Sequence, residues 1–450
     1  MQFVTIFHIL RGRMRLMRHL IGVPFLLASL YPLPALSAPL TLEQAWEQAE
    51  LANPALRATQ ANLATSEGEL TDARAPLWNN PRLATEGRKR TLPQTADPAR
   101  IDPARIDREW TVGLTQIFEI AGQQGKRRSA AEQSLAATQE VIAETRRQLR
   151  AEVEQRFVRV LSLQLRIQME ERTLKLIQKA ATAVRKRVTA GEDSRLDGNL
   201  AKVEAERAQN QVSVLREQLV QARAELAALL QLPTANLPEV GGYLNPSSAS
   251  YTLNELLNSA ANRPLLRAFD HREKAARSRL DLERAAVYPD VTLGLYTARE
   301  GPADSRDRIT GLSVSLPLPL FRRNGSGIGR ATTELTQVQV QQQAVQRDSR
   351  AQVLALWERW ESLQMRVKRL SESVLPSLEE NQHLSSVSFR AGEIGLLQLL
   401  LVNRQVLDGQ RDLLDAGTEL RLTQVSLEAA AGWQPTHDNH RTKKSKLRNS

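Results

Sequence analysis

The chain contains 450 residues, carries a formal net charge of +11 at pH 7, has a mean hydropathy of −0.38 and has no cysteine. The lack of cysteine excludes disulfides, thiolate chemistry and anchoring through a lipid-modified amino-terminal Cys. The positive charge alone is compatible with nucleic-acid binding, but the secretory signal at the amino end argues against that interpretation.

The two ends of the chain have recognisable composition. Four arginines, Arg11, Arg13, Arg15 and Arg18, precede an apolar run at 20–30 and small residues at 35–38. We expect residues 1–37 to be a secretory signal peptide, cleaved after Ser37. A membrane anchor is the alternative, although the run is short for a spanning helix. At the other end, five Lys or Arg against one Asp within 437–450 predict a disordered basic tail over 434–450.

Four long segments have the apolar pattern of coiled-coil helices. Residues 126–190 contain neither Gly nor Pro and repeat apolar residues seven positions apart, so they predict a helix roughly 95 Å long. The segments 196–230, 329–390 and 395–431 repeat this pattern, which imposes left-handed supercoiling. Pro376 predicts a kink or a broken turn in the third helix. A generic soluble coiled coil is the alternative that these repeats leave open.

An internal duplication argues against a generic coiled coil. Short matches recur in the same order about 200 to 210 residues apart. They are Thr41-Leu42 with Thr252-Leu253, 53–56 with 262–265, 74–78 with 284–288, Gly113-Leu114 with Gly311-Leu312, and 190–192 with 391–393. Each half therefore predicts a short helix, a medium helix, two strands, a long helix, a Gly-centred turn and a long helix. We expect a first repeat at 38–231, an equatorial linker at 232–251 and a second repeat at 252–433.

The predicted strands, about 82–120 and 290–319, have unlike faces. Trp110, Val112 and Leu114 alternate with small or polar residues, and 291–295 and 312–318 do the same. The strand at about 82–89 shows the alternation poorly. Four strands cannot close on themselves, and unpaired backbone groups in lipid cost several kcal/mol each. Several chains must therefore contribute to one closed membrane barrel; a soluble sandwich that caps a helical rod is the alternative.

These features resemble the TolC-like outer-membrane efflux proteins and, within that family, the branch of CzcC-like metal-cation efflux ducts. The resemblance spans about 39–433 and rests on motifs that are weak singly and specific together. They are Thr41 to Ala45, Asn53-Pro54, the Gly-rich passages 122–125 and 325–329, Leu375-Pro376, the two Ala-Gly-Glu turns and 431–433. It implies a homotrimer whose twelve strands form one β-barrel, continuous with a periplasmic α-helical barrel. An equatorial belt would collect 232–251, the short helices and the region after Gly432.

Family membership also implies where the functional residues lie. The two Gly turns would be the periplasmic tips, which close the resting tunnel and meet the tips of an adaptor protein. The tip residues carried over are Ala190, Gly191, Glu192, Ser194, Leu196, Ala391, Gly392, Glu393, Gly395 and Leu396. Glycine permits the positive φ of a tight reversal, so helix capping alone explains these glycines equally well.

Four acids beside the turns suggest a cation preference. Threefold repetition would gather Glu192, Asp193, Asp197 and Glu393 into a ring that attracts cations near a narrow mouth. Ordinary solvated turn acids are the alternative. We expect no catalytic residue, cofactor or metal site; His437 and His440 could hold a metal only weakly on the tail.

The function predicted from the sequence is that of an outer-membrane exit duct, with most of its mass in the periplasm. It would conduct solutes, heavy-metal cations among them, from an inner-membrane RND-type pump and its adaptor to the exterior. A duct for organic drugs or for type I protein secretion would share the fold. A periplasmic adaptor is a third candidate, but it would carry compact β domains around one hairpin.

Overall fold

The computed structural model describes residues 39–92, 105–233, 239–244, 251–301 and 306–433. The predicted signal peptide, the basic tail with His437 and His440, and parts of the equatorial linker lie outside the described residues. None of the described helices is long and apolar enough to span a membrane.

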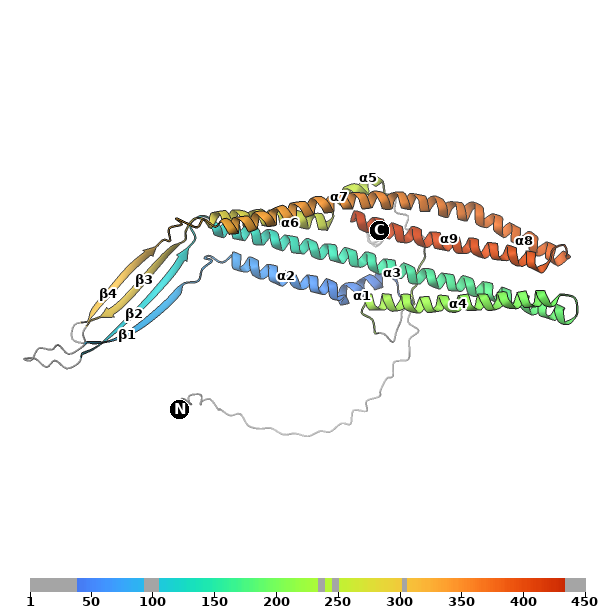
Figure 1. Ribbon diagram of the computed structural model, residues 1–450, viewed down its shortest axis with the longest axis horizontal. Coiled ribbons are helices and arrows are strands. Elements are labelled where there is room, and N and C mark those ends of the chain that lie inside the picture. The colour runs from blue at the N-terminus through green and yellow to red at the C-terminus, as the bar shows by residue number, and fades with distance from the viewer. Residues whose placement is uncertain (1–38, 93–104, 234–238, 245–250, 302–305, 434–450) are drawn as a thin grey trace, which may run out of the picture. The chain divides into compact units, whose positions relative to one another are not determined.

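The order of elements in the first half recurs in the second (Figure 1). The first half contains α1 (Leu42–Ala52), α2 (Pro54–Ala73), β1 (Arg82–Leu92), β2 (Arg105–Phe118), α3 (Gln123–Thr189) and α4 (Arg195–Leu229). The second contains α5 (Leu253–Ala261), α6 (Pro264–Ala285), β3 (Val291–Glu300), β4 (Asp307–Ser315), α7 (Gly325–Arg369), a π-turn (Leu370–Val374), α8 (Leu375–Ala391) and α9 (Leu396–Ala431).

The residues at the starts of the helices also recur in the two halves. Thr41 and Thr252 cap α1 and α5, and each forms a capping box with the residue three positions later, Gln44 or Glu255. The second helix of each half begins with proline, whose missing N–H is harmless at that position. The same capping residues therefore place the same helices in both halves.

The long helices have equal or nearly equal lengths in the two halves. α3 has 67 residues, and α7, the π-turn and α8 contain 45, 5 and 17, which together equal that number. The returning helices α4 and α9 have 35 and 36 residues. At about 1.5 Å per residue, each hairpin reaches about 100 Å from the strands.

The helices pack side by side in a layer. Near the strands, the helices lie in the order α2, α3, α6, α7. Near the Gly turns at the other end, the order is α4, α3, α9 and then α7 with α8. Residues from α2, α3, α6 and α7, among them Thr59, Ser134, Arg272 and Glu334, line one hollow. A hollow therefore lies where these four helices pack side by side.

The four strands form one antiparallel sheet in chain order, β1-β2-β3-β4. The register aligns Leu83, Leu114, Leu295 and Leu312 across all four strands, and their exposed fractions run from 48% to 73%. The next row contains Ala84, Gly113, Tyr296 and Gly311, which point to the other face. The predicted apolar and small or polar faces therefore exist, and the expected first strand extends to Leu92.

One predicted boundary was wrong. β4 ends at Ser315 rather than near 319, because Pro317 and Pro319 cannot donate to a strand ladder. The disturbance expected at Pro376 is present as the π-turn, which directly precedes α8. Its wider turn relieves the clash between a proline ring and the carbonyl four residues earlier.

Two apolar clusters join the short helices to the long ones. One contains Ala45, Leu56, Val153, Leu226 and Val240, so it connects α1, α2, α3, α4 and the linker. Its counterpart contains Tyr251, Leu256, Val353 and Leu427, with Trp433 packed against it. The short helices thus pack near the middle of the long helices, where a belt was expected from the family resemblance.

Candidate docking and gating tips

The first tip is a Schellman turn between α3 and α4. Gly191 has φ +80°, and the N–H groups of Gly191 and Glu192 donate to the carbonyls of Val188 and Arg187 at 3.1 and 2.9 Å. Ser194 caps α4, because its side chain accepts from the N–H of Asp197 at 3.2 Å. Ala190 is the C-cap of α3, and the side chain of Leu196 is 67% exposed.

The second tip repeats this geometry between α8 and α9. Gly392 has φ +75°, and the N–H groups of Gly392 and Glu393 donate to the carbonyls of Phe389 and Ser388 at 3.1 and 2.9 Å. Gly395, in extended conformation, is the N-cap of α9, which begins at Leu396. Ala391 is the last residue of α8. All ten predicted tip residues therefore lie in two equivalent turns.

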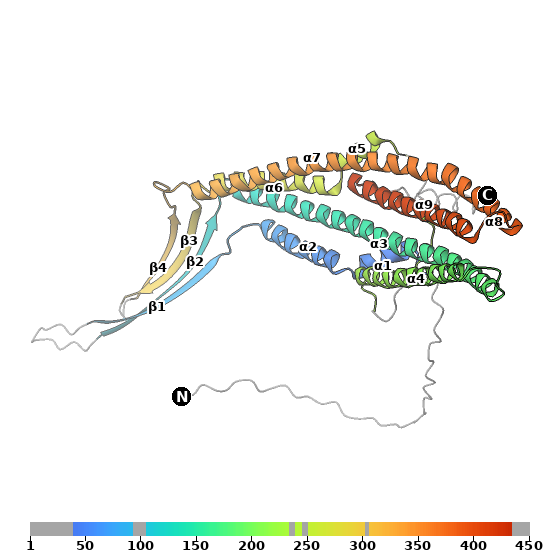
Figure 2. The same ribbon diagram turned by 45° about the vertical axis from the view of Figure 1, so that its right-hand side comes forward.

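Both tips lie at the end of the body remote from the sheet, as Figures 1 and 2 show. The equal lengths of α3 and of α7 with the π-turn and α8 place them at the same distance from the strands. The two turns therefore form one end of the molecule.

The four tip acids differ in the ion pairs and hydrogen bonds that they make. Arg187 lies 3.1 Å from Asp193 and 3.5 Å from Glu192, and Asp197 accepts from the Ser194 hydroxyl at 2.6 Å. Glu393 is exposed and makes no ion pair with a described residue. Exposed pairs of this kind are weak, but Arg187 offsets part of the negative charge at the first tip. Sequence reasoning did not include this arginine.

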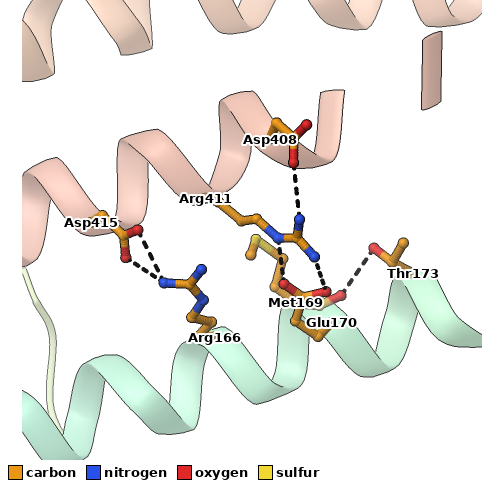
Figure 3. Close-up of polar contacts among 7 residues, drawn as sticks. All are labelled: Arg166, Met169, Glu170, Thr173, Asp408, Arg411 and Asp415. Carbon is orange, nitrogen blue, oxygen red and sulfur yellow. Dashed lines mark hydrogen bonds and ion pairs between the residues drawn. The ribbon is translucent and has the colours of Figure 1, made fainter. Parts of the chain in front are cut away.

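Of the polar contacts between the two halves, those that lie closest to the tips connect α3 with α9 (Figure 3). The guanidinium of Arg411 donates to both oxygens of Glu170 at 2.6 and 2.8 Å and to Asp408 at 2.9 Å. Arg166 donates to both oxygens of Asp415 at 2.7 and 3.0 Å. The side chain of Glu170 is only 3% exposed, and its hydrogen bond raises the pKa of Arg411.

This ion pair is a contact that sequence reasoning missed. A signal existed: Glu170 falls three residues after Ile167 and four before Leu174, so it occupies a seam position of the heptad. Beyond Glu170 towards the tips, no hydrogen bond or ion pair between described residues connects the first hairpin with the second. The ends of the two hairpins are therefore joined by no such contact.

No group of three or more His, Asp or Glu side chains among the described residues is arranged to hold a metal ion. The polar residues at the tips include the four carboxylates, the arginines Arg187, Arg195 and Arg390, and the capping Ser194. Such an arrangement can attract ions and present hydrogen-bonding groups to another protein.

Comparisons with known proteins agree with the fold. Residues 45–231 and 256–433 match the family described as Outer membrane efflux protein. The cobalt-zinc-cadmium resistance protein CzcC of Cupriavidus metallidurans is 27% identical over 380 residues, which are 84% of this chain and 85% of that protein. The pyoverdine export outer membrane protein OpmQ of Pseudomonas putida is 24% identical over 417 residues, 87% of this chain and 86% of that protein.

A solved structure has the same fold. The open state of the outer membrane channel MtrE from Neisseria gonorrhoeae superposes with a TM-score of 0.71 at 19% identity and covers 88% of this chain and 91% of that one. The fold predicted from the sequence, with long helical hairpins joined to antiparallel strands of a channel protein, is thereby confirmed.

Proposed function

Since the chain belongs to the outer membrane efflux protein family, we propose that it is the exit duct of a tripartite efflux system and passively conducts heavy-metal cations to the exterior. The similarity to CzcC, which extends over most of both chains, is the observation that carries the choice of metal cations. The duct itself performs no reaction, and the energy comes from an RND-type pump in the inner membrane.

The free edges of the layer support assembly into a closed ring. β1, α2 and α4 lie at one edge and all belong to the first half, whereas β4, α7 and α8 lie at the other and all belong to the second. One edge of a copy can therefore meet the opposite edge of the next, which is the head-to-tail contact that closes rings. Three copies give a twelve-stranded barrel with the leucine row towards lipid.

The tips are the proposed contact with the adaptor and the gate of the tunnel. They are exposed, they form one end of the molecule, and no polar contact joins the described ends of the two hairpins beyond Glu170. These features suit a surface that has to meet a partner and separate.

The acids at the tips are proposed to favour cations, with Glu393 as the main contributor because Arg187 pairs with Glu192 and Asp193. Neutralising Glu192, Asp193, Asp197 and Glu393 together should lower the cation preference of channels reconstituted in planar bilayers. Unchanged selectivity would leave these acids as ordinary turn residues.

Cellular metal content tests the choice of substrate. Zinc, cobalt, cadmium and copper are measured by elemental mass spectrometry after a metal challenge, in a strain that lacks the gene and in the same strain with the gene restored. Accumulation on deletion that is reversed by restoration is expected. Equal metal content in the two strains would contradict metal export.

Organic solutes are the second candidate, because OpmQ, a pyoverdine exporter by name, covers as much of the chain as CzcC does. If deletion causes retention of an organic solute and not of metals, this second function replaces the first. Co-purification with an ATP-driven exporter instead of a resistance-type pump would indicate protein secretion.

A further inference from the structure

The segment that joins β4 to α7 exposes a run of apolar side chains. The alternation of β4 continues past its end, where the side chains of Leu318 and Leu320 are 70% and 68% exposed. Phe321 follows with an exposed fraction of 96%, the highest among the large apolar side chains of the described residues. Any cover for these side chains therefore comes from outside the part of the chain that the structure describes.

The backbone of this segment cannot extend the sheet. Pro317 and Pro319 have no N–H group to donate. The N–H of Leu320 donates to the carbonyl of Leu318 at 2.9 Å across Pro319, which closes a three-residue turn. Fewer backbone donors are therefore left without a partner than in an ordinary extended segment. Such a chain can lie at the border of a bilayer, where an unpaired strand edge would be costly.

The segment is also longer than its counterpart in the first half. Ile117, Thr292 and Ser315 lie in one row of the sheet. Both long helices begin after a residue with left-handed backbone, Gly122 or Asn324. Five residues lead from Ile117 to Gly122, but nine lead from Ser315 to Asn324. The internal duplication is therefore broken here by four residues, and the shorter passage contains no arginine.

The height of the segment matches the border of a membrane. A lipid-facing band is about 25 Å tall and its strands tilt by about 40°, so half the band corresponds to about 16 Å, or about five residues, along a strand. Leu312 belongs to the leucine row of the sheet. With that row in the middle of the bilayer, Asp307 at the start of β4 and Pro317 lie at the two edges of the band. Phe321 and the residues after it then lie at the depth of the lipid headgroups.

Two arginines follow at this depth. Arg322 and Arg323 are exposed, and neither makes a hydrogen bond or an ion pair with a described residue. The carboxylate of Glu283, which reaches the end of the segment, instead accepts a hydrogen bond from Asn324 at 2.6 Å. Two positive charges are therefore free beside exposed apolar side chains. Guanidinium groups bind phosphate oxygens through paired hydrogen bonds.

We propose that residues 316–323 form a lipid-binding site at the periplasmic border of the barrel. The apolar side chains enter the periplasmic leaflet of the outer membrane, and Arg322 and Arg323 bind the phosphates of anionic phospholipids. The inference rests on the proposed trimeric barrel. Charge complementarity and continuity with the leucine row favour lipid as the occupant.

Fluorescence quenching tests the apolar part of this site. Because the chain has no cysteine, Phe321→Cys carries a single fluorescent label in purified full-length trimers. These are reconstituted in vesicles of equal amounts of phosphatidylcholine and phosphatidylglycerol. Spin labels near the top of the lipid acyl chains should quench the fluorescence more strongly than spin labels near the chain ends. Aqueous acrylamide should quench it only weakly.

The control label is at Met365→Cys. Met365 is 64% exposed and lies about 60 Å along α7 from the end next to the strands. Acrylamide should quench this label and the spin-labelled lipids should not. Quenching of the Phe321→Cys label by acrylamide alone would overturn the lipid contact. Protection from both quenchers would also overturn it, because protein would then cover the segment.

Lipid preference tests the two arginines. Native mass spectrometry of the reconstituted trimers measures their relative affinity for phosphatidylglycerol over phosphatidylcholine. A basic residue near a membrane surface strengthens the binding of anionic lipid by about fivefold. Arg322→Gln/Arg323→Gln should therefore lower the relative affinity by about fivefold for each arginine that binds a phosphate. Arg322→Lys/Arg323→Lys should keep most of the preference, because it keeps the charge.

A matched control removes two charges elsewhere. Arg347 and Arg350 are exposed on α7, more than about 30 Å from the end next to the strands. Arg347→Gln/Arg350→Gln should leave the relative affinity unchanged. An equal loss in this control, or no loss in Arg322→Gln/Arg323→Gln, would overturn the headgroup site.

Failure of the proposed function appears differently. It is seen as protein that forms no trimers in the vesicles, or as unaltered solute export on deletion of the gene. Wild-type trimers that insert but show no preference for phosphatidylglycerol contradict the lipid site alone.

Discussion

At Gly191 and Gly392 an added Cβ would meet no heavy atom within 4 Å. The cost of a side chain there is therefore conformational and not steric, about 1–2 kcal/mol for an L-residue in the left-handed region. We expect Gly191→Val or Gly392→Val to abolish export while trimers remain in the membrane. Metal content and native gels measure the two effects.

Two variants serve as controls for the turn prediction. Gly191→Asn should keep most export, since asparagine tolerates the left-handed region. Gly395→Ala should be neutral, because Gly395 has φ −80° and open space around it. Normal export by both valine variants would show that the turns do not act as gate or docking tip.

Glu428 is a second residue whose environment makes a prediction. Burial raises its pKa, and it accepts hydrogen bonds from Gln424 at 2.9 Å and from Tyr251 at 3.3 Å. Because the pKa of Glu428 is raised in the folded state, folding is most favourable at low pH, where the carboxyl group is protonated. This stability is lost as the pH rises through that pKa and the buried group ionises. Glu428→Gln should therefore raise the unfolding temperature near pH 7 and change it little at acidic pH.

Thermal unfolding of the purified protein, followed by circular dichroism across that pH range, measures the effect. Glu419→Gln on the same helix is the control, because the side chain of Glu419 is half exposed. A lower unfolding temperature for Glu428→Gln near pH 7 would show that hydrogen bonds to the carboxylate outweigh the cost of its burial.

At the scale of the elements, α8 packs closely against α9 at Gly409. A Cβ on Gly409 would lie 2.6 Å from Cδ1 of Leu378, one turn after the π-turn. Gly409→Leu should displace α8 and lower the unfolding temperature, and Leu378→Ala in the same chain should recover part of the loss. Gly417→Ala is the control, with its nearest contact at an ordinary 3.9 Å. Equal stability of Gly409→Leu and the wild type would contradict tight packing at this point.

The elements also show what sequence could predict. The helices and three of the four strands were evident because their apolar periods extend over many residues and recur in both halves. The π-turn was missed, since Pro376 marks a disturbance but not the geometry that absorbs it. The end of β4 was missed because apolar alternation continues through 316–318 although the prolines cannot pair.

The site was predicted less completely than the fold. Both tip turns followed from their matched glycines. The pairing of Arg187 with two tip acids and the burial of Glu170 against Arg411 depend on how neighbouring helices are placed. Such contacts between distant segments leave only a faint trace in the sequence, here a charged residue in a heptad seam.

For the whole molecule, the leucine row on the sheet gives a prediction about membrane insertion. Leu295→Arg should cost about 2–4 kcal/mol if this face meets the middle of the bilayer and should reduce the amount of protein in outer-membrane fractions. Thr111→Arg, on the opposite face of the sheet, should be tolerated. Immunoblots of separated membranes compare the two, and equal amounts would contradict a lipid-facing leucine row.

The equal 67-residue spans in the two halves restrict how this protein can change in length during evolution. Removing one heptad from a single hairpin would leave its tip about 10 Å short of the other, so that an adaptor would meet a stepped end. The two tips stay at the same height only when both hairpins lose the same number of residues. In each hairpin the deletion must also preserve the heptad repeat. Relatives adapted to envelopes of different depth should therefore carry insertions or deletions in matched pairs.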